Sequence, residues 1–116
     1  MKEGDIVLVA MPQADGVSKN RPVVFLRELP PFRDALVCGV SSQLRHEVKD
    51  FDEIITANDA DFKTSGLIDS SLIRLGFLTT VTRTKIAGSI GSISRTRHHR
   101  LLRKLSDHLI EDTDFN

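Results

Sequence analysis

An arginine and two adjacent serines have side chains and positions suited to binding a phosphate group. Arg21 directly precedes Pro22 at the start of an apolar segment, so its planar guanidinium is expected at a strand end, where it can make two parallel hydrogen bonds to phosphate oxygens. Ser41 and Ser42 end another apolar segment, and their hydroxyls can donate to the same kind of group. Both features can also be purely structural, because strand-end arginines are commonly solvated and serine pairs commonly form turns.

The strongest local concentration of basic residues lies between positions 95 and 104. A helix in this region would carry Leu101, Leu105 and Leu109 on one face and basic side chains on the opposite face. The basic face could contact RNA phosphates, bind an acidic partner or be solvated, and solvation is the ordinary state of an amphipathic helix. Neighbouring histidines diverge by about 100° on a helix, so they do not predict a metal site. The basic residues are Arg95, Arg97, His98, His99, Arg100, Arg103 and Lys104.

Short apolar segments separated by turn-forming residues predict a mostly β fold ahead of this helix. Residues 12–20 and 58–61 are rich in Pro, Gly, Asp, Asn or Ser, which indicates loops. Gly76 predicts a bulge or bend within a strand region, and Ser94 is suited to cap a helix that continues to Glu111. Several strands followed by a helix predict a small barrel with the helix over one opening or alongside. The expected strands cover residues 6–9, 22–26, 36–40, 53–55, 72–75, 77–81 and 86–93.

The composition predicts one compact domain spanning residues 1–116. The chain is 40% hydrophobic, and its 16 basic and 16 acidic residues cancel, so any polyanion site must be local. No apolar run approaches the ~20 residues that cross a bilayer, and the amino terminus lacks a signal pattern, so we expect a cytoplasmic protein without membrane association. Cys38, the single cysteine, lies in an apolar segment and is expected to be a buried, inert thiol.

The order of several short segments along the chain is informative. GDIVLV at 4–9, KNRPVVFL at 19–26 and VSSQ at 40–43 are followed by SGL at 65–67, SLIR at 71–74 and GSIS at 91–94. This order resembles the MazF/PemK family of toxins from type II toxin-antitoxin systems, over roughly residues 3 to 110. The resemblance implies an SH3-like small β-barrel, related to CcdB and Kid, with a C-terminal helix and usually a homodimer.

The resemblance also implies a reaction, which is metal-independent cleavage of single-stranded RNA without a cofactor. The RNA's own 2′-hydroxyl attacks the adjacent phosphorus and leaves a 2′,3′-cyclic phosphate, which requires a base, an acid and positive charge on the phosphorane. Ser42 is the near alternative to Ser41 as the residue that holds the phosphate. The residues implied to be catalytic are Arg21, Ser41 and Arg74, and those implied to bind RNA are Lys19, Asn20, Ser42, Gln43 and His46.

One position departs from the family pattern. Gly76 stands where many relatives have an aspartate proposed as general base. His46 could replace it by residue type, because an imidazole titrates at about pH 6.5, although a loop histidine is usually only solvated. The chain has no Trp or Tyr, so Phe32 and Phe51 are the candidates for stacking on bases, with the core as the more common place for a phenylalanine.

The implied partners are single-stranded RNA, a cognate antitoxin protein, a second copy of the chain and, through the antitoxin complex, operator DNA. The alternative is a barrel of the same fold that has lost its base and binds an antitoxin, DNA or a protein such as gyrase. The cleft between Arg21 and Arg74 separates the two hypotheses. An acid or imidazole beside the arginines favours the enzyme, and a cleft without a titratable group favours the binding module.

Overall fold

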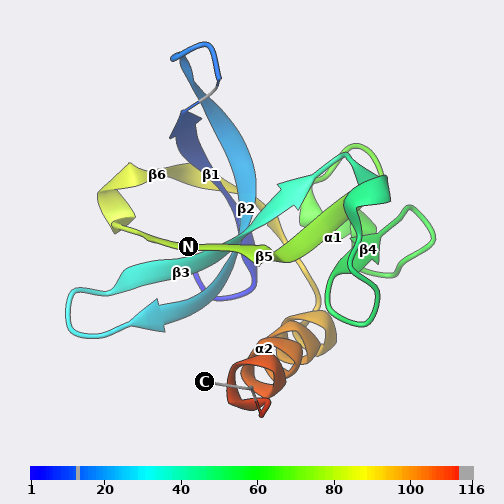
Figure 1. Ribbon diagram of the computed structural model, residues 1–116. Helices are drawn as coiled ribbons and strands as arrows, with labels where there is room; N and C mark the ends of the chain where they lie inside the picture. The colour runs from blue at the N-terminus through cyan, green and yellow to red at the C-terminus, as the bar shows by residue number, and fades with distance from the viewer. Residues whose placement is uncertain (13, 113–116) are drawn as a thin grey trace.

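The computed structural model describes residues 1–12 and 14–112 and consists mainly of strands (Figure 1). As predicted, the fold is mostly β and ends in a long helix, α2 (Arg95–Ile110). A one-turn helix, α1 (Phe62–Ser65), and two 3-10 turns, η1 (Leu44–His46) and η2 (Arg83–Lys85), connect strands. The strands are β1 (Asp5–Pro12), β2 (Ser18–Leu29), β3 (Asp34–Ser41), β4 (Glu53–Ile55), β5 (Ser71–Val81) and β6 (Ile86–Ser92).

The strands form one antiparallel sheet in the order β4-β5-β3-β2-β1-β6. The sheet curls without closing, because no hydrogen-bonded ladder joins the edge strands β4 and β6 among the described residues. The segment around α1 packs against β6 instead: a Cβ added at Gly66 would lie 2.1 Å from the Ile90 carbonyl oxygen. Gly66 also has φ of 76°, a conformation that glycine adopts without strain. This contact joins the segment that follows β4 to the edge strand β6, so that the curled sheet is partly closed.

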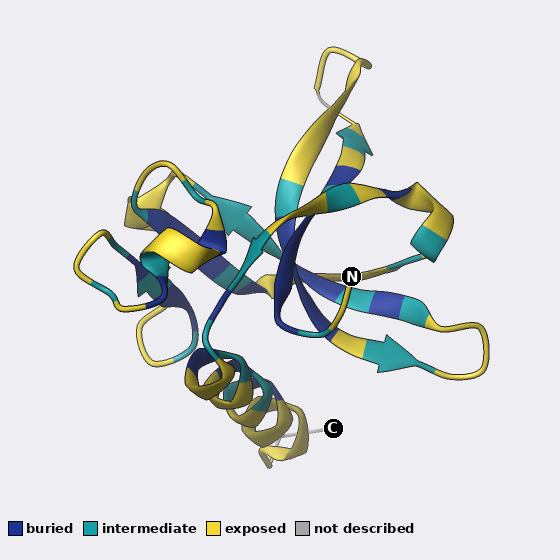
Figure 2. Ribbon diagram, turned by 180° about the vertical axis from the view of Figure 1, so that it is seen from behind, coloured by how far each residue is buried: buried dark blue, intermediate teal, exposed yellow. Residues whose placement is uncertain are grey.

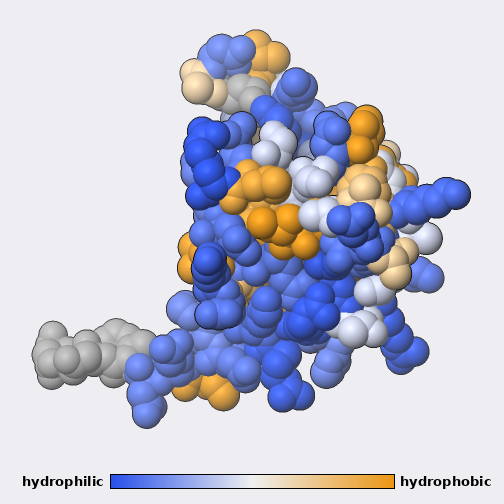
Figure 3. Space-filling model, turned by 90° about the vertical axis from the view of Figure 1, so that its right-hand side faces the viewer, coloured by the Kyte–Doolittle hydropathy of each residue, from blue (hydrophilic) through white to orange (hydrophobic). Residues whose placement is uncertain are grey.

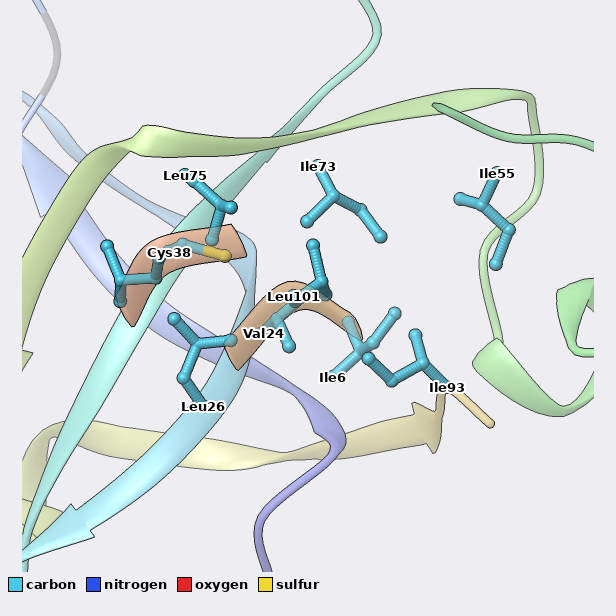
Figure 4. Packing of buried hydrophobic residues seen from close by; sticks show 10 residues of the cluster. Ile6, Val24, Leu26, Cys38, Ile55, Ile73, Leu75, Ile93 and Leu101 are labelled. Atoms are coloured by element: carbon cyan, nitrogen blue, oxygen red, sulfur yellow. The ribbon is translucent and has the colours of Figure 1, made fainter. Parts of the chain in front are cut away.

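Each face of the sheet carries its own group of buried apolar residues. On one face, β1, β2, β3 and β5 pack against α2 (Figure 4). The opposite face holds a second group, formed by β1, β2, β3 and β6. The first group includes Ile6, Val24, Leu26, Cys38, Ile55, Ile73, Leu75, Ile93, Leu101 and Leu105, and the second includes Val7, Val9, Val23, Phe25, Ala35, Val37 and Ile86.

Helix α2 begins where predicted, and its buried side faces the sheet (Figure 2). The Ser94 hydroxyl oxygen accepts a hydrogen bond from the Arg97 backbone N–H at 3.1 Å, as an N-cap should. Leu101 and Leu105 are buried, but Leu109 is 69% exposed. Leu109 shares the helix face of Leu101 and Leu105, as their spacing predicts, but it does not join the core, since the last turn extends beyond the sheet.

The prediction of a solvated basic face on α2 was wrong in part. Arg97 is only 6% exposed, and its guanidinium bonds Glu53 at 2.8 Å and Asp61 at 2.8 Å and 3.2 Å. Arg100 and Lys104 reach the same Glu53 carboxylate, at 2.6 Å and 3.2 Å. We call these five residues the ionic clasp, because they join α2 to β4 and to the residue that precedes α1.

The clasp shifts the titration of both of its carboxyl groups. Burial alone would raise the pKa of Glu53, but hydrogen bonds from Arg100 and Lys104 outweigh it and the pKa lies below its usual range. The pKa of Asp61 is lowered in the same way: burial opposes the shift, and hydrogen bonds from Arg97 and from the Ser94 backbone N–H outweigh it. Both carboxylates are therefore ionised in the folded protein near neutral pH.

The loop expected at residues 12–20 is shorter than predicted. Ser18, Lys19 and Asn20 belong to β2 and pair with residues 10–12 of β1, while Gln13 lies outside the described residues. The backbone ladder holds this polar hairpin, which projects beyond the rest of the sheet (Figure 1), so the absence of an apolar period did not indicate a loop there.

The sequence expectations for Gly76 and Cys38 agree with the structure. Gly76 lies in a bulge of β5, since the partner of Cys38 is Leu78 whereas the partner of Gly39 is Arg74. Cys38 is fully buried, and burial raises the pKa of its thiol to about 12. Among the described residues, no helix combines the length and apolar character needed to cross a membrane.

Candidate functional site

A pocket of about 690 Å³ lies between the β1–β2 hairpin, the end of β3 and the segment that joins α1 to β5. Five of the residues predicted for the site line it: Arg21, Ser41, Ser42, Gln43 and Arg74. They come from β2, from the end of β3 and from β5, far apart in the sequence. The sheet therefore brings all three residues with a predicted catalytic role into one cavity.

The strand register explains why these side chains meet. Val23 of β2 lies opposite Gly39 of β3, and Gly39 lies opposite Arg74 of β5. Directly paired residues share a face of the sheet, and residues two apart on a strand share it as well. Arg21, two residues before Val23, and Ser41, two residues after Gly39, therefore belong to the same face as Arg74.

Gly39 lies between Val23 of β2 and Arg74 of β5, and its lack of a side chain leaves room for the Phe77 ring against the sheet. A Cβ at this position would lie 3.1 Å from the Phe77 ring, so the ring rests almost directly on the Gly39 backbone. The β5 bulge carries Phe77 into this position, where its side chain is 45% exposed and lines the pocket. The bulge and the glycine together place an aromatic surface beside the arginines.

Arg74 is available to bind an anion. It is half-buried, and across the described part of the chain its guanidinium makes no hydrogen bond or ion pair. Arginines that lose water contact normally bond a carboxylate, as Arg97 does in the clasp. Arg21 is exposed and lines the same cavity. Two guanidinium groups in one pocket favour binding of a phosphate group.

Ser41 combines a structural and a chemical capacity. Its hydroxyl oxygen accepts a hydrogen bond from the Gln43 backbone N–H at 3.0 Å, which shapes the turn after β3. A hydroxyl that accepts at its oxygen can still donate its proton. The turn therefore leaves Ser41 able to donate to a ligand in the pocket, with Ser42 and Gln43 beside it.

Three residues predicted to bind RNA do not line the pocket. Lys19 and Asn20 are exposed on the projecting part of β2, and His46 is exposed in η1. Phe32 is 82% exposed in the β2–β3 turn and Phe51 packs partly against the core, so neither aromatic candidate faces the cavity. Proximity in sequence to the Ser41–Ser42 turn was a poor guide, because η1 carries the chain away from the pocket.

Among the pocket residues that sequence reasoning missed, two have side chains suited to catalysis or base stacking. Asp69 precedes β5 and is the one acidic side chain that lines the cavity among the described residues. Phe77 is the one aromatic side chain there. Asp69 lies in a Ser-rich and Asp-rich stretch, which is typical of any turn, so its composition gave no distinct signal.

The pocket is partly apolar as well as charged. Met11, Pro12, Leu67, Ile68 and Ile90 contribute to its lining. Ile68 is 89% exposed, and apolar side chains gather among hydrophilic ones on the face seen in Figure 3. The cavity thus offers apolar contact area next to two cationic groups, a combination suited to a nucleotide with its flat base and charged phosphate.

Comparison with known proteins gives one match. The model of a family described as PemK-like, MazF-like toxin of type II toxin-antitoxin system matches residues 2–109. No curated protein matches the chain. The matched range contains the whole sheet, every residue that lines the pocket and almost all of α2.

Proposed function

The chain belongs to the PemK-like, MazF-like toxins of type II toxin-antitoxin systems, and we propose that it is an endoribonuclease that cleaves single-stranded RNA in the pocket between Arg21 and Arg74. The observation that carries this proposal is the joint lining of one cavity by Arg21, Ser41 and Arg74. A toxin of this family has an antitoxin as its partner.

The proposed reaction is an internal transfer at phosphorus. The 2′-oxygen of the RNA bonds to the adjacent phosphorus, the bond to the 5′-oxygen breaks, and a 2′,3′-cyclic phosphate remains. Arg21 and Arg74 stabilise the negative charge on the phosphorane, and the Ser41 hydroxyl donates a hydrogen bond to a phosphate oxygen. Removing one such donor from a preorganised site costs about 10²- to 10³-fold in rate.

The rest of the pocket supports RNA binding. A base can stack on the exposed ring of Phe77, while Ser42 and Gln43 offer hydrogen bonds. Lys19, Asn20 and His46, predicted to bind RNA, lie outside the pocket and would meet neighbouring nucleotides rather than the one that is cut. Binding of operator DNA through the antitoxin complex and assembly into a homodimer are proposed from the family alone.

The alternative, a binding module that has lost catalysis, is less well supported. It predicted a cleft without a titratable group, and Asp69 lines the cleft. The carboxylate favours an enzyme, because a module that only binds an acidic or polyanionic partner gains nothing from a negative charge beside its two arginines.

The test is cleavage of a mixed-sequence single-stranded RNA by the purified protein in the presence of a metal chelator. The expected products carry 2′,3′-cyclic phosphate ends, and Arg21→Ala and Arg74→Ala should each lower the rate about 10²-fold or more. Arg95→Ala is the matched control, because Arg95 is exposed on α2 and does not line the pocket. No cleavage by the wild-type protein at any pH from about 5 to 9 would contradict the proposal and favour the binding module.

A further inference from the structure

We propose that Asp69 is the general base that removes the proton from the 2′-hydroxyl of the RNA. This inference rests on the proposed ribonuclease function. It assigns the role of general base to a residue other than His46 and at a position other than Gly76. Its basis is the position of Asp69, which lines the same pocket as Arg21 and Arg74. Among the residues that the structure describes, it is the only acidic side chain there.

The backbone at Asp69 is held from both sides. Ahead of it, Gly66 packs against the Ile90 carbonyl group, and the Leu67 backbone N–H donates to Ser65 at 3.1 Å. Behind it, the Ser71 hydroxyl donates to the Asp69 carbonyl oxygen at 2.8 Å, and β5 begins. The carboxylate therefore extends from an anchored segment, which is what a catalytic group needs to keep its position.

The carboxylate itself has no role in holding the fold. The Asp69 side chain is exposed and, within the described residues, accepts no hydrogen bond and forms no ion pair. The clasp carboxylates Glu53 and Asp61, in contrast, are buried and bonded to arginines. An uncommitted carboxylate in a cavity can accept a proton from a ligand, whereas a carboxylate that already accepts several hydrogen bonds is a poor base.

Among the described residues that line the pocket, no other group can act as the base. The side chains of Arg21 and Arg74 stay protonated, and serine hydroxyls need a base themselves. His46 is exposed in η1 and does not line the cavity. Gly76 has no side chain that could accept a proton and is not among the residues that line the cavity.

Asp69 and water exchange the two protons that the proposed reaction moves. The Asp69 carboxylate takes the 2′-hydroxyl proton, the 2′-oxygen bonds to phosphorus, and the bond from phosphorus to the 5′-oxygen breaks. The 5′-oxygen takes a proton from water, and Asp69 then returns its proton to solvent. The carboxylate and the phosphate repel each other, and the two arginines that line the same pocket offset this repulsion.

The experiment compares Asp69→Asn with wild-type protein in single-turnover RNA cleavage from about pH 5 to 9. Asp107→Asn is the control: it removes the same charge from an exposed carboxylate on α2, outside the pocket. RNA with a 2′-O-methyl group at the cut position measures binding without cleavage, and thermal unfolding measures stability. Asp69→Asn should lower the rate at neutral pH about 10²- to 10⁴-fold, while thermal unfolding stays unchanged and RNA binding is not weakened, because the variant removes a charge that repels the phosphate.

The pH profile separates a base from a residue that only shapes the site. Without a general base, hydroxide must take the 2′-hydroxyl proton, so cleavage by Asp69→Asn should accelerate about tenfold per pH unit, a dependence that wild-type protein should not show. Full activity of Asp69→Asn, or a changed preference for the cut sequence at an unchanged rate, overturns the assignment and leaves the ribonuclease proposal standing. Absence of cleavage by wild-type protein overturns both.

Discussion

Replacing Glu53 by glutamine should cost the protein several times more stability than neutralising an exposed charge. The Glu53 side chain is 5% exposed and accepts from Arg97 at 2.8 Å, from Arg100 at 2.6 Å and 2.7 Å, and from Lys104 at 3.2 Å. Glutamine keeps the shape of the side chain but removes the charge and turns an NH₂ group toward three cations. The buried guanidinium of Arg97 would then lose one of its two principal carboxylate partners.

The loss of stability in Glu53→Gln depends on which of its cationic partners can find other carboxylates or water. Breaking a buried ion pair costs about 3–5 kcal/mol. Arg97 keeps Asp61 at 2.8 Å, and the side chains of Arg100 and Lys104, 47% and 25% exposed, can turn toward water. The lower end applies, so we expect a loss of about 3 kcal/mol in the free energy of unfolding. This corresponds to a fall in the thermal midpoint of about 10 °C or more for a domain of this size.

Equilibrium unfolding in urea measures this loss. With a slope of about 2 kcal/mol per molar urea, the midpoint of Glu53→Gln should fall by roughly 1.5 M. Glu28→Gln is the control, because Glu28 also bonds two arginines, at 2.9 Å and 2.7 Å, but its side chain is 36% exposed and water screens such pairs. A loss below about 1 kcal/mol for Glu53→Gln, the scale of an exposed pair, would refute the view that the clasp holds α2 to the sheet.

Three further results are expected. The pKa values of Glu53 and Asp61 are lowered in the folded state, so their contribution to stability should be complete above about pH 5 and lost as the pH falls through and below about 4. The midpoint of thermal unfolding, measured against pH, should show this decline. The decline should be weaker in Glu53→Gln, which lacks one of the two carboxylates. Gly66→Ala should lower the free energy of unfolding in urea by more than about 1 kcal/mol, because φ is 76° and the new Cβ would lie 2.1 Å from a carbonyl oxygen. Gly76→Ala is the control: it adds a Cβ in open space and should change the free energy of unfolding by about 0.5 kcal/mol or less. The Cys38 thiol, fully buried and with its pKa raised to about 12, should react with an aromatic disulfide reagent only as fast as the protein unfolds, and rapid labelling of the native state would contradict its burial.

Features set by local sequence could be predicted, and features set by register could not. Runs of β-branched residues located the strands, and Ser94 located the start of α2. The pocket depends on Gly39 lying opposite Arg74 and on a bulge that carries Phe77 over the glycine. Strand pairing between segments distant in the chain decides both. Arg97 was misjudged for a related reason: a helical period marks the apolar face, but it does not show that Glu53 and Asp61 lie across from a neighbouring basic residue.

Asp69, the proposed base, could not be identified from the sequence for a different reason. His46 was considered because of its residue type and its place just after the serine turn, whereas Asp69 resembled any acidic turn residue. The distinction between them is spatial, since the contact of Gly66 with β6 holds the segment of Asp69 against the cavity. Packing of the segment after α1 against β6 created this neighbourhood, and the residue types of the segment do not reveal which cavity it borders.

The ionic clasp also affects how strongly the protein binds RNA nonspecifically and how that binding depends on salt. Arg97, Arg100 and Lys104 are bonded to internal carboxylates, so these basic residues of α2 are not available to displace counterions from a passing strand. The pocket contributes two arginines and the projecting part of β2 adds Lys19, and on single strands each neutralised phosphate changes the slope of log affinity against log salt by only about −0.7. Association should therefore vary weakly with ionic strength and depend on the fit of a few nucleotides, so that abundant RNA without a fitting site would not sequester the toxin.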